Sequence, residues 1–232
     1  MKFSDYDAFA YVACGVVAFA ISDVLFDTRL VFTSGWTFSE GLLFLIAAYL
    51  AGHLVASPSS WVLEKLFVGK VLGAPTAHLI GLGPPGRLGA SLRPLFRGYF
   101  AEMPKKQLSA VAQSENLTAN NSVDGVFWRA YVVARHNPIS SARMESFLKL
   151  YGFCRNMSFL GLATFVGALY IGVSNWCEGG WHDLVETHLV MSTAAGIVWL
   201  VLLLRYLKFY RLYALEVLLA YAKSISDKDR RS

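Results

Sequence analysis

A histidine and a glutamate in the first half of the chain have the types and spacing for acid–base chemistry. His53 lies inside an apolar stretch, and Glu64 follows it three helical turns later on roughly the same side. An imidazole near a carboxylate can relay protons or act as a general base. His53 and Glu64 are therefore the candidate catalytic residues. The alternative for His53 is a structural hydrogen bond to a neighbouring helix in a bundle.

Four other polar residues lie at the ends of apolar stretches. Asp23, near the end of the first stretch, either lines a water-filled path or sits at headgroup depth. Arg155 and Arg205 mark a membrane boundary, where Asn156 can bond between helices. In a pore-forming oligomer, a ring of such arginines would favour anions.

Neither metal nor phosphate chemistry has a matching motif. The stretch 176–188 is rich in metal-ligand types, but their spacing matches no established zinc site: Cys177, His182, Asp183, Glu186, His188. Residues 81–89 (Gly-Leu-Gly-Pro-Pro-Gly-Arg-Leu-Gly) look like a phosphate loop, yet no Lys-Ser/Thr pair follows and two prolines remove amides. The sequence predicts no metal site and no cofactor, and a turn at 81–89.

The composition places these residues in a membrane protein. Of 232 residues, 55% are hydrophobic and 16% are charged, whereas soluble domains average about 25% charged residues. Four stretches approach the roughly 20 apolar residues that cross a bilayer: 8–26, 41–56, 157–173 and 188–204. The predicted fold is an all-α membrane protein with four transmembrane helices.

The distribution of cations predicts the orientation of these helices. Twelve Lys and Arg residues lie in 58–156, seven in 205–232 and one in 1–7, whereas the loop 27–40 holds one and 174–187 holds none. The positive-inside rule then places the N and C termini in the cytoplasm. The expected location is the inner membrane of a bacterium. The charge is thus a topology signal, and no direct nucleic-acid partner is expected.

All seven prolines lie between the second and third apolar stretches, which marks a separate module. The expected parts are a first transmembrane hairpin (1–57), a Pro/Gly-rich cytoplasmic module (58–138), a second hairpin with cytoplasmic extensions (139–223) and a polar tail (224–232). Ser57 and Pro58 should begin a new helix that reaches about residue 72. No disulfide is expected, because the three cysteines should lie at different depths.

Both helices of the second hairpin should extend far beyond the bilayer. The third runs unbroken from about residue 140, and a helix over 188–223 would be about 54 Å long. Four tyrosines recur on one face of that extension: Tyr206, Tyr210, Tyr213, Tyr221. This face is expected to pack on the partner helix, on the module or on another subunit.

The layout is similar in outline to small bacterial membrane effectors of antiviral defence, in which a few spans carry a cytoplasmic helical part. That resemblance concerns architecture alone and transfers no residue. It favours a non-enzymatic homo-oligomer that receives a cytoplasmic signal or protein partner and alters membrane integrity or conductance. The alternatives are a lipid-modifying enzyme at the inner leaflet, using His53 and Glu64, and a membrane anchor for a cytoplasmic partner.

Overall fold

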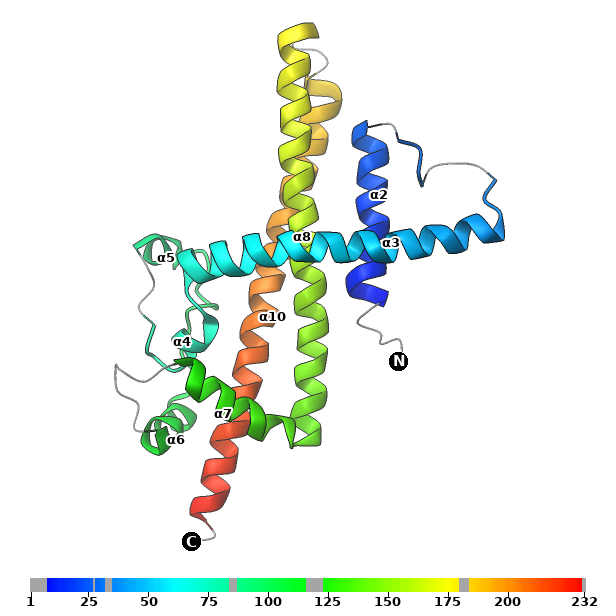
Figure 1. Cartoon of the computed structure of the whole chain (residues 1–232). Helices are drawn as coiled ribbons and strands as arrows, with labels where there is room; N and C mark the ends of the chain where they lie inside the picture. The colour runs from blue at the N-terminus through cyan, green and yellow to red at the C-terminus, as the bar shows by residue number, and fades with distance from the viewer. Residues whose placement is uncertain are drawn as a thin grey trace. The chain divides into compact units, whose positions relative to one another are not determined.

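The computed structural model describes residues 8–26, 28–31, 35–83, 87–115, 123–179 and 184–230, and within these ranges the regular structure is entirely helical. The elements are η1 (Ala8–Val12), α2 (Ala13–Phe26), α3 (Phe38–Ser59), η2 (Ser60–Leu72), α4 (Pro75–Leu79), α5 (Arg87–Leu92), α6 (Lys105–Glu115), α7 (Val123–Arg135), α8 (Pro138–Gly179), η3 (Leu184–Leu189) and α10 (Val190–Asp229) (Figure 1). The all-α prediction is therefore confirmed.

Three helices are long and apolar enough to cross a membrane: Phe38–Leu79, Pro138–Ser174 and Thr187–Lys228. A fourth apolar helix, Ala10–Phe26, is shorter. At most 28% of the most apolar window of any long helix is buried within the chain. Their apolar side chains face outward, as a lipid environment requires.

The chain divides into two compact units. The apolar unit consists of Met1–Leu63 and Gly152–Tyr206, and the helical module consists of Glu64–Tyr151 and Leu207–Ser232. The module thus includes the first part of α8 and the last part of α10. The rest of α8 and the rest of α10 belong to the apolar unit, so each of these helices runs through both units.

The expected helix start at Ser57 and Pro58 is wrong, because α3 continues through Pro58 into η2. Proline lacks the N–H that would bond the preceding turn, so it normally ends or kinks a helix. Here the wider i→i+5 turns of η2 begin two residues later and carry the helical path onward. The actual start is Thr37, whose side chain forms a reciprocal capping box with Glu40.

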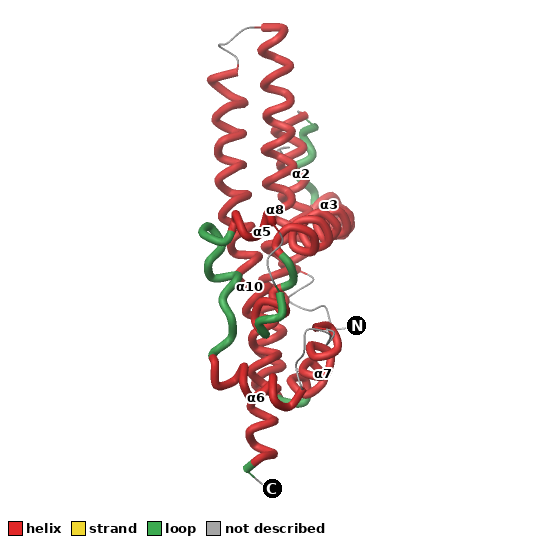
Figure 2. The backbone as a smooth tube through the Cα atoms, turned by 90° about the vertical axis from the view of Figure 1, so that its left-hand side faces the viewer, coloured by secondary structure: helices red, strands yellow, loops and turns green. Residues whose placement is uncertain are grey.

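Within the apolar unit, α3 runs transverse to α2 and to the apolar parts of α8 and α10 (Figure 1, Figure 2). Two glycines make this crossing close. A Cβ atom on Gly15 would overlap the carbonyl oxygen of Ala48, and one on Gly52 would overlap that of Tyr11. Helices associate in membranes through such small residues.

The hairpin of α8 and α10 in the apolar unit uses glycines in the same way. A Cβ atom on Gly161 would lie 3.0 Å from Cα of Trp199, and one on Gly196 would lie 3.2 Å from the ring of Phe165. The rings of Phe165 and Trp199 stack at 6.2 Å. The two helices therefore pack with large rings opposite glycines.

The helical module has a conventional apolar core. The last part of α10 supplies Ala214, Val217 and Leu218, which pack against Ala130 and Ala134 of α7. Leu79, Ile80, Met103 and Met144 complete this cluster.

Candidate functional site

A buried polar cluster of the apolar unit, which we call the polar node, is centred on Asn156. Its amide is fully buried in α8. The Oδ1 atom accepts hydrogen bonds from Ser59 Oγ at 2.7 Å and from Arg155 Nε and Nη2 at 3.2 and 3.1 Å. The Nδ2 atom donates to the carbonyl oxygen of Ala10 at 3.2 Å. One amide thus joins η1, α3 and α8.

The geometry of the polar node makes it sensitive to movement of α8. A buried polar group that loses its partner costs about 1–3 kcal/mol, and Asn156 has partners on two other helices. Sliding or rotating α8 would break both contacts together. The polar node therefore favours the arrangement of α8, α3 and η1 in which both bonds are made.

No protein-family model, curated protein or solved structure gave a significant match to this chain.

The candidate boundary residues Arg155 and Asn156 both belong to the polar node, whereas Arg205 is exposed on α10. Ser59 was not among the sequence candidates, although it bonds Asn156 from 97 positions away. Ser59 lies three positions beyond the second apolar stretch and next to Pro58, and a serine at that position could have been recognised as a partner for a polar residue on another helix.

The two candidate catalytic residues have separate aromatic partners. His53 is exposed, stacks on the ring of Tyr11 at 3.8 Å and meets the ring of Tyr49 edge-on at 4.6 Å. Glu64 accepts a hydrogen bond from the hydroxyl of Tyr151. These contacts position both side chains against neighbouring helices.

Asp23 organises the chain that follows α2. Its carboxylate accepts hydrogen bonds at 2.6 Å from Thr28 Oγ1 and from the backbone N–H groups of Leu30 and Val31. Arg29 within this turn has a left-handed backbone with φ of 53°. Charge-assisted bonds of this kind are stronger than neutral ones, so Asp23 holds the loop against the helix end.

The structure distributes the tyrosine face of α10 over both units. Tyr206 is fully buried in the apolar unit. In the module, the ring of Tyr210 lies 5.0 Å from that of Tyr151, and the ring of Tyr213 lies 6.3 Å from Phe127. The hydroxyl of Tyr221 donates to Glu115.

The glycine-rich segment that resembles a phosphate loop begins as a helix cap. Gly81, with φ of 73°, follows α4, and its N–H donates to the carbonyl of His78 while that of Leu82 donates to Ala77. These amides are therefore committed to the helix end. Residues 84–86 lie outside the described residues.

His78 is a buried polar residue that the sequence reading missed. Its Nε2 lies 2.8 Å from the carbonyl oxygen of Leu72, and its Nδ1 lies 3.1 Å from that of Gly83. The hydroxyl of Tyr99 donates to the carbonyl of Gly73 at 2.8 Å. Burial raises the pKa of Tyr99, so this hydroxyl stays protonated and keeps its donor. The glycines before and after this histidine in the sequence could have indicated that its ring lies close to the backbone.

An ion pair joins α6 to α7 in the module. Arg129 donates to the carboxylate of Glu115 through Nη2 and, at 3.2 Å, through Nε. These bonds lower the pKa of Glu115, and the hydroxyl of Tyr221 adds a further donor. The pair fixes the end of α6 to α7 and to α10.

The described residues contain no group of three or more side chains placed to hold a metal ion. Of the residues of metal-ligand types in the stretch 176–188, His182 and Asp183 lie outside the described residues, as does the side chain of Glu186. Cys14, Cys154 and Cys177 are all free thiols.

Proposed function

We propose that the protein is an inner-membrane protein of bacteria that works as a homo-oligomer and without catalysis. It receives a signal or a protein partner at the helical module and changes the integrity or conductance of the membrane. The supporting observation is continuity: α8 begins in the helical module and ends in the apolar unit, and α10 returns by the reverse route.

Two long helices make this coupling mechanical. The 42 residues of α8 and the 40 of α10 would each extend about 60 Å at 1.5 Å per residue. A change in the packing around Val217 and Leu218 acts on the same helix that carries Trp199 in the apolar unit. Small shifts of packed helices are a common means of switching.

The polar node would act as the latch of this coupling. Asn156 lies four residues beyond the point where α8 enters the apolar unit. A displacement of α8 that starts in the module and reaches Asn156 would therefore break its bonds to Ser59 and Ala10. A two-state element of this kind is what links a binding site to a response.

The proposed orientation places the termini and residues 58–156 in the cytoplasm, on the basis of the cation asymmetry. Four passes would require α3 to cross as the second, so α3 would have to turn from the transverse direction that it has in Figure 1 to run along α2. Four apolar helices enclose little space, so conduction requires several copies around a symmetry axis.

Release of a trapped dye from vesicles containing the purified full chain tests this function. Replacing Asn156→Leu removes the amide at similar volume and should change the release rate at least about fivefold, because breaking the latch shifts the two states by at least about 1 kcal/mol. Ser59→Ala should act in the same direction.

Ser158→Ala is the matched control. Ser158 is buried on α8 two positions from Asn156, but its hydroxyl donates to the carbonyl of Trp199 at 3.5 Å. Ser158→Ala should leave the rate of dye release unchanged. A chain that stays monomeric in lipid discs and releases no dye, with or without the Asn156 substitution, would refute the proposal.

A further inference from the structure

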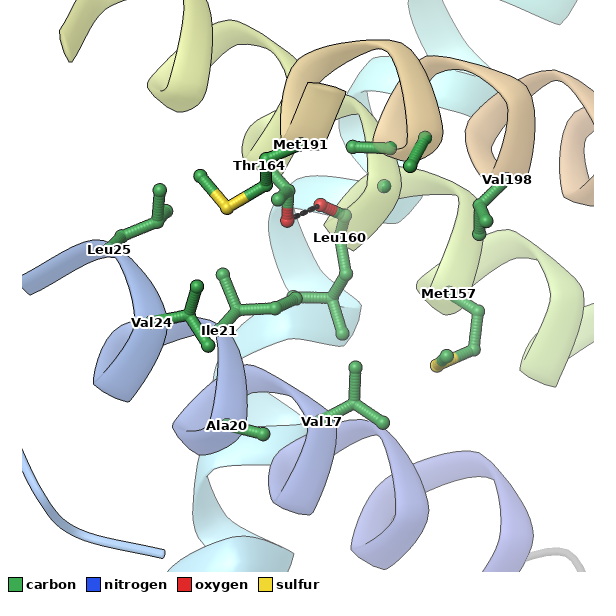
Figure 3. Close-up of a pocket in the computed structure, with 13 residues that line it drawn as sticks. Val17, Ala20, Ile21, Val24, Leu25, Met157, Leu160, Thr164, Met191 and Val198 are labelled. Atoms are coloured by element: carbon green, nitrogen blue, oxygen red, sulfur yellow. Dashed lines mark hydrogen bonds between the residues drawn. The ribbon is translucent and has the colours of Figure 1, made fainter. Parts of the chain in front are cut away.

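A groove in the apolar unit has the properties of a ligand site. It has a volume of about 350 Å³ and lies between α2, α8 and α10. Figure 3 shows Met157 and Val17 towards one end and Leu25 and Met191 towards the other. Its walls are almost wholly apolar, and small residues such as Ala195 give it depth.

The lining offers no polar group to a ligand. Its one hydroxyl belongs to Thr164, which donates to the carbonyl of Leu160 within α8 at 2.8 Å. Water would therefore find no partner there. The occupant must be apolar along the length of the groove.

The groove is short and lies along the helices. Along α8 it extends from Met157 to Thr164, about 10 Å at 1.5 Å per residue. A segment of one hydrocarbon chain can lie along a groove of this length without needing a polar partner.

Positive charge lies beyond one end of the groove. Arg155 precedes the lining residue Met157 by two positions on α8. On the antiparallel α10, Arg205 follows Val198 by two helical turns. The contact of Ser158 with Trp199 fixes the register, so residues 155 and 205 both lie beyond the same end along the helix axes. Arg155 donates to Asn156, whereas the side chain of Arg205 is exposed. Arginine is well suited to bind phosphate.

We propose that this groove binds one acyl chain of an anionic phospholipid, with its phosphate held by Arg205. The acyl chain would fill the space between three helices that otherwise meet incompletely. The lipid would thereby stabilise the packing of α2 against the α8–α10 hairpin. This site goes beyond the proposed function and depends only on the apolar unit lying in a membrane.

Native mass spectrometry of the full chain in mild detergent tests the acyl-chain part. With added phosphatidylglycerol, we expect one lipid to stay bound per chain. Ala195→Phe fills the groove and should abolish this retention. Ile197→Phe, at an exposed position outside the lining, is the matched control and should keep it. If Ala195→Phe does not fold, Ala20→Phe fills the same groove from α2.

The headgroup part needs a charge comparison. Phosphatidylglycerol should bind at least about fivefold more tightly than phosphatidylcholine with the same chains. Arg205→Gln should remove most of that preference, whereas Lys208→Gln, on an exposed residue of the same helix, should keep it.

Three outcomes would overturn the proposal. Retention of lipid by Ala195→Phe at the level of the unchanged chain would show that the groove is not the site. Equal binding of palmitate and phosphatidylglycerol would make a free fatty acid the ligand. A lipid-free dimer that Ala195→Phe converts to a monomer would make the groove an interface between copies.

Discussion

Leucine side chains differ in exposure between the two units of this chain. In α3 of the apolar unit, Leu50 and Leu54 are 58% and 76% exposed. In the helical module, Leu79 and Leu218 are buried at 0% and 1% exposure. Leucine therefore faces outward in one unit and inward in the other.

Lipid around the apolar unit and water around the module would account for this difference. Water drives the module to bury apolar surface against itself, as in the cluster around Val217 and Leu218. Lipid tails are as apolar as leucine, so helices in a membrane gain little by hiding it. The apolar unit is held instead by glycine crossings and by the polar node of Asn156. The module buries its hydrophobic residues, and the apolar unit buries its small and polar ones.

The largest expected effect comes from Gly15→Ala. The added Cβ would overlap the carbonyl of Ala48, which belongs to a helix backbone and cannot rotate away. We expect the contact of α2 with α3 to be lost, at a cost above about 3 kcal/mol. Thermal unfolding of the detergent-solubilised chain would measure it.

The control for this substitution is Gly41→Ala. A Cβ on Gly41 has no atom within 4 Å, although the residue lies in α3, the helix that carries Ala48. It should be neutral or slightly stabilising, because alanine favours helix more than glycine does. Equal melting points for the two variants would show that glycine crossings do not hold the apolar unit.

A pair of leucine substitutions comes next in size. Leu218→Ala should cost about 3 kcal/mol, because it leaves a cavity in the module core. Leu50→Ala removes the same atoms from an exposed site and should change stability by less than about 0.5 kcal/mol in detergent. Chemical unfolding followed by circular dichroism would measure both. Equal losses would contradict the assignment of different solvents to the two units.

The smallest effect is the pH dependence of the pair formed by Glu115 and Arg129. Hydrogen bonds from Arg129 lower the pKa of Glu115 below its ordinary value of 4.5. The stabilisation is therefore complete above that value and is lost as the pH falls through the lowered pKa. It should be less than about 1 kcal/mol, because Arg129 is exposed.

Glu115→Gln should remove this part of the acid dependence, measured as the melting temperature between pH 6 and pH 3. The exposed Glu145→Gln is the control and should melt with the acid dependence of the unchanged chain. If Glu115→Gln kept that dependence as well, the pair would not contribute.

Several elements were predictable because their causes are local. Apolar run length and the unbroken pattern after Pro138 gave the long helix α8, and the tyrosine spacing gave the continuation of α10. The Pro58 boundary was wrong, because a local rule about proline yielded to the wider turns of η2. Asn156 and Arg155 were recognised as polar residues at a helix boundary, but their partners were not.

Composition and run length alone predicted an all-helical chain with four membrane-crossing helices, and the described residues are helical with three helices long and apolar enough to cross a membrane. Helix formation depends on hydrogen bonds within one segment, and membrane crossing depends on the apolar length of that segment. Both can be judged from residues that are neighbours in the sequence. Only the tertiary structure decided that Asn156 meets Ser59 and Ala10, 97 and 146 positions away. Such contacts depend on how closely helix backbones approach, and that is set by glycines on separate segments rather than by any local pattern.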